Sequence, residues 1–155
     1  MKSLASFLVA ACISLPAFSD DIERNAAAGQ LSDVGSTAIG LAVGATEANP
    51  LGIVSLALKA AVYQKITEAP ETERPELWGM YGALGWGATA NNICVISTAA
   101  TGVGILLCPL IGLIAGTSVY AAGEEERNRA TFAAICDQKR KEVPTLSCEF
   151  KEAAK

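Results

Sequence analysis

The chain has 155 residues, of which 51% are hydrophobic and 18% charged, and its formal net charge is −4. A chain of this length forms a single domain, and its charged fraction is below the roughly 25% of an ordinary soluble domain. It contains no histidine, which excludes Ser-His-Asp and Cys-His nucleophile pairs and His-ligated zinc; its Lys and Arg residues form no stripe with aromatic residues that would indicate nucleic-acid binding.

The first 19 residues follow the order of a cleaved secretory signal. Lys2 supplies a positive start, residues 4–15 are apolar, and small residues precede Asp20 at the cleavage positions. Two alternatives stay open: Cys12 as the lipidated residue of a lipoprotein signal, or residues 4–18 as an uncleaved anchor. We expect residues 1–19 to be a signal peptide that directs the chain to the bacterial inner membrane.

Two helices are predicted next. Residues 20–30 are polar and Ala-rich, which suits a helical lead-in to a first membrane span. Asn49 is a good N-cap and Pro50 a good first helical residue, so a second helix begins there. Both expected spans, residues 31–46 and 51–67, are short for a bilayer core about 30 Å thick.

The run from Leu77 to Gly123 is the strongest membrane signal, with 47 residues and no Lys, Arg, Asp or Glu. As one helix it would be about 70 Å long, so it is expected to hold two spans joined by a turn. Asn91 and Asn92 are the expected turn or a polar kink, with spans at 77–90 and within 93–122. The alternative is a buried hairpin of a soluble protein, but little polar surface is left to cover it. Interfacial aromatic residues are expected at Trp78, Tyr81 and Trp86.

The charged segment 124–155 is predicted to be a water-exposed tail with a short amphipathic helix. Cys136 and Cys148 are expected to form a disulfide if this tail is periplasmic and to stay reduced if it is cytoplasmic. A cleaved signal followed by four spans places the tail outside, whereas its cluster of basic residues favours the cytoplasm; we expect the periplasm. Cys94 and Cys108 are expected as free, buried thiols.

The predicted fold class is therefore all-α: a small helical integral membrane protein with about four embedded helices and a C-terminal amphipathic helix. Its expected parts are a signal peptide at 1–19, a membrane domain at 20–123 and a tail at 124–155. Small residues recur every four positions, which lets helix backbones approach closely in a membrane. They could pack one chain or assemble several copies as a glycine zipper. The expected packing residues are Gly40, Gly44, Gly104, Gly112 and Gly116.

Polar residues within the first two spans form a candidate site. Asp33 and Ser36 share one helix face, and Lys59 lies on a polar face of the next helix. A charge at the membrane centre costs about 2.5–3.5 kcal/mol unless it is paired or hydrated, so these residues suggest a function. The alternative is that Asp33 and Glu47 lie near the two membrane surfaces, that Lys59 extends its charged end toward a surface, and that any pairing is only structural. The full predicted cluster is Asp33, Ser36, Thr37, Glu47, Asn49, Lys59, Tyr63, Asn91 and Asn92.

The segment from Asp33 to Leu51 also resembles the signature of an uncharacterised family of small prokaryotic multi-span membrane proteins. The resemblance rests on Asp-x-x-Ser-Thr-x-x-Gly-Leu-x-x-Gly, followed by Glu-Ala-Asn-Pro. A later Asn-Asn pair in that family is similar to Asn91-Asn92. The resemblance implies a membrane fold with a shared polar site, and it implies no reaction. The export signal and the cysteine-bearing tail depart from the family pattern.

No catalytic motif is found in the sequence, such as Gly-x-Ser-x-Gly or a phosphate-binding loop. We therefore expect a protein that is not an enzyme and has no cofactor and no metal. Its expected partners are the lipid bilayer, partner membrane helices or further copies of the chain. One hypothesis is a structural or accessory envelope factor, including a phage-encoded one, that packs through glycine-rich faces. The alternative is an oligomeric channel or transporter-like element that uses the polar cluster.

Overall fold

The computed structural model describes residues 22–43, 52–99 and 104–151, and within these ranges every regular element is a helix. The all-α fold class is thus confirmed. The expected signal peptide lies outside the described residues, as do Gly44, Glu47 and Asn49. The helices are α2 (Ile22–Ala42), α3 (Gly52–Glu68), α4 (Arg74–Thr98), α5 (Gly104–Ala122) and α6 (Glu124–Glu142).

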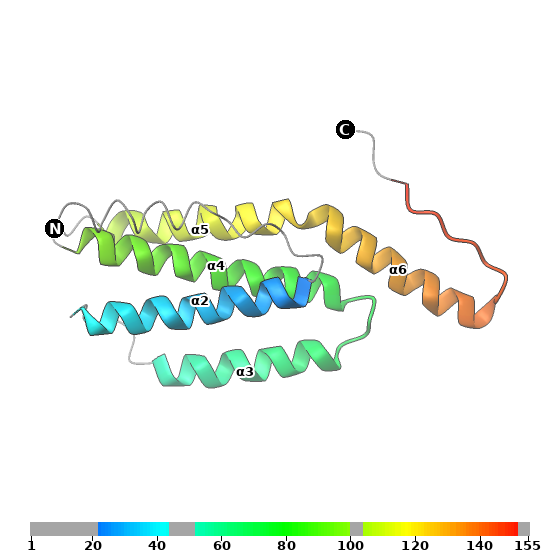
Figure 1. Cartoon of the computed structure of the whole chain (residues 1–155), viewed down its shortest axis with the longest axis horizontal. Coiled ribbons are helices and arrows are strands. Elements are labelled where there is room, and N and C mark those ends of the chain that lie inside the picture. Colours follow the sequence, from blue (N-terminus) through cyan, green and yellow to red (C-terminus); the bar gives the residue numbers. More distant parts are fainter. Residues whose placement is uncertain (1–21, 44–51, 100–103, 152–155) are drawn as a thin grey trace.

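Helices α2 to α5 lie alongside one another and alternate in direction, with α4 between α2 and α5 (Figure 1). We call the end where α2 and α4 begin the base, and the end where α4 finishes and α5 begins the tip. Helix α6 continues from α5 beyond the base. Within the described part of the chain, no single helix is long and apolar enough to cross a bilayer. Residues 106–122 and α6 satisfy that criterion only when they are taken together, and a 45° bend separates them.

Helix α4 runs without a break from Arg74 to Thr98, so the expected turn at Asn91-Asn92 is wrong. Pro75 lies in the first turn, where a missing N–H costs least. An asparagine inside a helix costs at most about 0.7 kcal/mol relative to alanine. The tertiary hydrogen bonds of Asn92 outweigh this small local preference, and the connection to α5 falls after Ala99 instead.

Glycines allow α4 to contact both of its neighbours through the backbone. A Cβ on Gly85 would lie 2.5 Å from the carbonyl carbon of Gly29 on α2. On the opposite side, a Cβ on Gly112 would lie 2.8 Å from the Gly87 oxygen, and one on Gly116 equally close to the Ala83 oxygen. The glycines of α5 therefore pack against α4 of the same chain. Of the other predicted packing residues, Gly40 is buried on α2 and Gly104 lies against Thr98.

Trp78 and Tyr81 lie in an aromatic cluster near the base. Trp78 is only 5% exposed and Tyr81 only 7%. The ring centroids of Tyr63 and Trp78 are 4.9 Å apart, and those of Trp78 and Tyr81 are 6.0 Å apart. These rings fill the junction between α3 and α4, and their expected position at a membrane interface stays a prediction. Trp86 is half-buried and donates its indole N–H to the Asn25 side chain at 3.0 Å.

Both cysteine pairs form disulfides, Cys94–Cys108 between α4 and α5 and Cys136–Cys148 between α6 and the tail. The second was expected for a periplasmic tail. The first corrects the expectation of free thiols. Its two Cα atoms are 5.4 Å apart, within the range that a disulfide bridges, because the close packing of α4 against α5 brings the two positions opposite each other.

Arg127 attaches α6 to the base and is only 4% exposed. Its guanidinium donates to the Glu76 carboxylate at 3.1 Å and to the Tyr120 backbone oxygen at 2.6 Å. It also lies 3.9 Å from the centre of the Tyr120 ring, which is a favourable cation–π position.

Replacing Arg127 with glutamine is expected to lower the free energy of unfolding by about 1.5–3 kcal/mol, the usual contribution of a hydrogen bond to a charged group. The matched control is Arg129→Gln, because the Arg129 side chain is 52% exposed and pairs with Glu125 one turn away on the same helix. Such exposed pairs contribute about 0.3–0.5 kcal/mol. Thermal unfolding in detergent, followed by circular dichroism, measures both variants, and equal losses would contradict the assigned role of Arg127.

Candidate functional site

Three helices bring polar side chains together near the middle of α2 and α3 and toward the tip end of α4. Asp33 and Ser36 lie one turn apart on the buried face of α2. Lys59 reaches them from the antiparallel helix α3, and Asn92 reaches them from α4. We call Asp33, Ser36, Thr37, Lys59 and Asn92 the polar cluster.

The Asp33 carboxylate is the centre of the polar cluster. Its Oδ2 forms an ion pair with Lys59 Nζ, and its Oδ1 accepts a hydrogen bond from Asn92 Nδ2 at 2.8 Å. The side chains of Asp33 and Lys59 are 13% and 22% exposed, so both charges are largely removed from solvent. Opposite charges that are buried together avoid the large cost of an isolated buried ion.

The Asn92 amide faces three oxygens at once. Besides Asp33, its Nδ2 lies 3.1 Å from Ser36 Oγ and 3.0 Å from Thr37 Oγ1. A primary amide has two N–H donors, so at least one hydrogen is shared between two acceptors. Ser36 donates its own hydrogen to the Asp33 backbone oxygen at 3.0 Å. Asn92 therefore fixes the α2 face to α4 in one register.

Two residues that sequence reasoning missed support the polar cluster. Tyr81 donates its hydroxyl to the Lys59 backbone oxygen at 2.9 Å, and Gln30 Nε2 donates to the Tyr81 backbone oxygen at 2.6 Å. Gln30 is buried one turn before Asp33. Its i, i+3 spacing from Asp33 was a signal in the sequence that could have added it to the predicted face.

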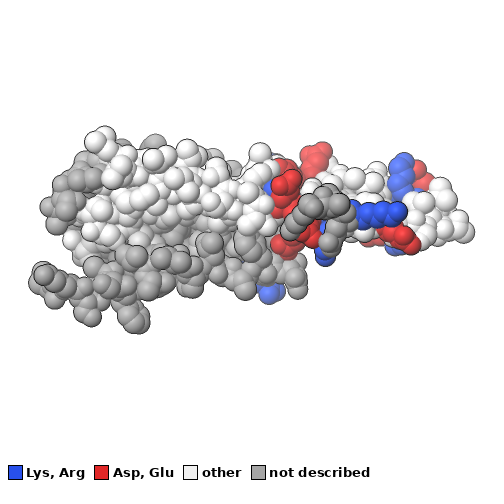
Figure 2. Space-filling model, turned by 90° about the horizontal axis from the view of Figure 1, so that it is seen from above, with Lys and Arg blue, Asp and Glu red and all other residues white. Residues whose placement is uncertain are grey.

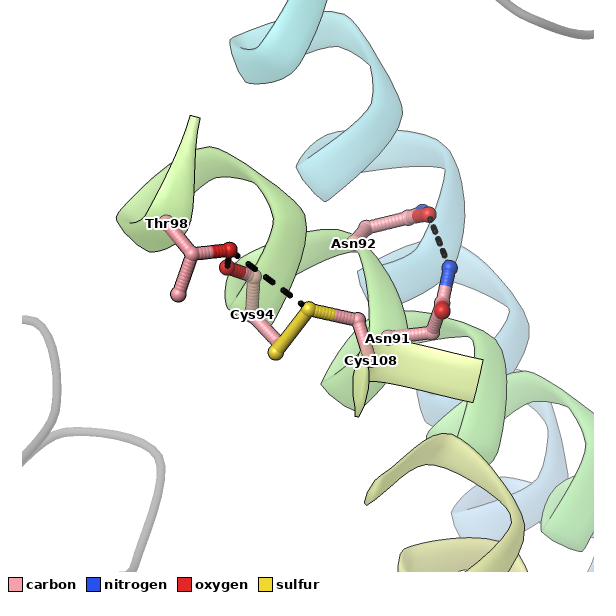
Figure 3. The surroundings of a disulfide bond; sticks show 5 residues. All are labelled: Asn91, Asn92, Cys94, Thr98 and Cys108. Atoms are coloured by element: carbon pink, nitrogen blue, oxygen red, sulfur yellow. Dashed lines mark hydrogen bonds between the residues drawn. A yellow bond between two sulfur atoms is a disulfide. The ribbon is translucent and has the colours of Figure 1, made fainter. Parts of the chain in front are cut away.

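Other predicted members of the site lie elsewhere. Tyr63 donates to Glu23 nearer the base. The backbone and Cβ of Asn91 pack against Gly112 of α5, while its amide lies 3.5 Å from the Asn92 side-chain oxygen (Figure 3). Glu47 and Asn49 lie outside the described residues.

The chemistry of the polar cluster is that of ion pairing and hydrogen bonding. It joins one acid, one base, two hydroxyls and an amide. Within the described ranges, no three His, Cys, Asp or Glu side chains are grouped so that they could hold a metal ion.

No known protein family, curated protein or solved structure matches this chain. The family resemblance of residues 33–51 therefore stays a prediction. Of that segment the structure describes residues 33–43, which carry Asp33, Ser36 and Thr37 of the polar cluster.

Proposed function

We propose that this chain is a small non-enzymatic membrane protein, a structural or accessory factor of the bacterial envelope. The observation that carries the proposal is the reversed placement of polar and apolar side chains. Leu31, Leu84 and Leu106 are 72%, 72% and 82% exposed, whereas the polar residues Gln30, Asp33, Ser36 and Thr89 are buried. Such an arrangement is unfavourable in water and favourable in lipid, where polar groups must be satisfied internally.

The distribution of charge supports the same proposal. On the face in Figure 2, Lys, Arg, Asp and Glu side chains gather at the base and on α6, and the described part of the surface toward the tip shows none of them. Helix α5 contains 19 residues, which gives a length of about 28 Å against a bilayer core of about 30 Å. In the proposed arrangement, lipid surrounds the bundle from the tip to the base, and α6 extends into water.

Partner helices in this proposal contact the outward faces of the bundle. Gly87, Gly112 and Gly116 already pack α4 against α5 within one chain, so they are not free for a second copy. The outward face of α5 is a row of exposed aliphatic residues: Leu106, Leu107, Leu110, Ile111, Leu113 and Ile114. This face suits acyl chains and apolar partner helices.

The second candidate function is a channel or transporter-like element, and the polar cluster favours it. Charged residues inside membrane proteins commonly mark ion or substrate paths. Four short helices would need several copies to enclose a pore. Chemical crosslinking in native membranes tests this candidate: an ordered oligomer supports it, and a strict monomer contradicts it.

Leu113→Lys tests the membrane proposal, because Leu113 is exposed and lies halfway along α5. In a soluble protein an exposed substitution usually changes stability by less than about 0.5 kcal/mol, whereas a lysine at a bilayer centre costs about 2.5–3.5 kcal/mol. We expect wild-type protein to resist alkaline carbonate extraction and the variant to be lost from the membrane pellet. The control is Ile135→Lys on α6, which is also exposed and should behave as wild type. Carbonate-soluble wild-type protein, with Leu113→Lys equally abundant, would contradict the proposal.

A further inference from the structure

The two disulfides lie at opposite ends of the molecule. Cys94 is one turn before the end of α4, and Cys108 is one turn after the start of α5, so their disulfide lies near the tip (Figure 3). Cys136 and Cys148 join α6 to the tail that follows it, and α6 extends beyond the base (Figure 1). We call them the tip disulfide and the tail disulfide.

If the hairpin were inserted through a bilayer from the cytoplasm, the tip and tail cysteine pairs could not both become oxidised. Disulfides form and persist in the periplasm or outside the cell, whereas cytoplasmic thiols are kept reduced. If α4 and α5 crossed the membrane during synthesis, the tip and the base would lie on opposite sides, and one pair would stay reduced. Two disulfides therefore require that both ends shared an oxidising compartment when the bonds formed.

The tip also lacks the charges that would hold a loop in the cytoplasm. Cytoplasmic loops carry an excess of Lys and Arg, but residues 77–123 contain neither. From α4 onward, every charged residue precedes Leu77 or follows Gly123, and those that the structure describes lie at the base or beyond it. The α4–α5 hairpin, without a charge between Leu77 and Gly123, can enter lipid without the cost of burying an ion, while the charged base stays in water.

We infer that the α4–α5 hairpin enters the lipid bilayer from the oxidising side, tip first, after the chain has been exported and both disulfides have formed. This inference rests on the proposed membrane location. Each cysteine pair passes two electrons and two protons to a protein disulfide of the export compartment, which becomes a dithiol while the new S–S bond forms by exchange. The surface that receives the hairpin is thus the periplasmic face of the bilayer.

Two double variants test the inference, each keeping one cysteine pair of the mature chain. Cys136→Ser with Cys148→Ser keeps the tip pair, and Cys94→Ser with Cys108→Ser keeps the tail pair. Thiols are blocked in intact cells with a membrane-permeant maleimide, and mass spectrometry counts the blocked thiols in the carbonate-resistant protein and, for the chain without residues 2–19, in total cell protein. We expect both pairs to be oxidised in membrane-bound protein, and both to be reduced when residues 2–19 are deleted. If a variant does not fold, disulfide-linked peptides from a digest of the wild-type chain show which cysteine pairs are oxidised.

A reduced tip pair beside an oxidised tail pair in membrane-bound protein would overturn the inference, because the tip would then have stayed in the cytoplasm. An equally oxidised tip pair without residues 2–19 would also overturn it, since oxidation would not need export. Loss of the wild-type protein from the membrane pellet would instead contradict the proposed function, so the two failures are distinguishable.

Discussion

Replacing Gly85 with alanine is expected to lower the free energy of unfolding by about 3 kcal/mol, at the upper end of overpacking costs. The added Cβ would lie 2.5 Å from the Gly29 carbonyl carbon and 2.6 Å from the Gln30 nitrogen. Both of these atoms belong to the backbone of α2, which cannot rotate away as a side chain could. The α2–α4 contact must open, and the polar cluster spans that contact.

Gly35→Ala is the matched control for Gly85→Ala. Gly35 also lies inside a helix, but a Cβ there would have nothing within 4 Å. Alanine is favoured over glycine in helices by roughly 0.5–1 kcal/mol, so this variant should be as stable as wild type or more so. Thermal unfolding in detergent compares the two. Equal stability of both variants would mean that α2 and α4 do not pack through Gly85.

The second large effect is expected from separating the charges of Asp33 and Lys59. Asp33→Asn or Lys59→Met alone should lower the free energy of unfolding by about 3–5 kcal/mol, because each leaves one buried charge without its partner. The double variant should recover most of this loss, since no buried charge remains. Lys65→Met is the control: Lys65 lies on the same helix, but its side chain is 80% exposed, so little change is expected.

A double-mutant cycle on unfolding in detergent measures this coupling. If the losses from Asp33→Asn and Lys59→Met simply add in the double variant, the two side chains are not energetically paired. That result would contradict the ion pair at the centre of the polar cluster.

The sequence carried enough information to predict the helices and the faces that pack. The uncharged run from Leu77 to Gly123 indicates two adjacent apolar helices, and the three- and four-residue spacing of Asp33, Ser36 and Gly40 predicts the buried face of α2. These features depend on helical periodicity, which is local in the sequence. The proximity of Asp33 and Lys59 could also be predicted, because each residue lies on a polar face of its own helix.

The register of the α4–α5 hairpin could not be predicted in the same way. Asn91 and Asn92 have the local preference of turn residues, yet Asn92 is held in the helix by oxygens on α2, more than 50 positions earlier. Placing the turn there also concealed the tip disulfide. Once the connection falls after Ala99, Cys94 and Cys108 lie opposite each other. Long-range contacts determine both the position of the connection and the pairing of the cysteines, and a local sequence pattern carries no information about such contacts.

Photo-crosslinking to lipid tests the membrane location of the bundle most directly. A diazirine side chain is introduced at Leu84 on α4 and at Leu106 on α5, which are both highly exposed, and at Gln138 on α6 as the water-exposed control. After illumination of native membranes, we expect phospholipid adducts at Leu84 and Leu106 and none at Gln138. Reaction with water alone at Leu84 and Leu106, with no lipid adduct, would contradict the membrane-embedded bundle.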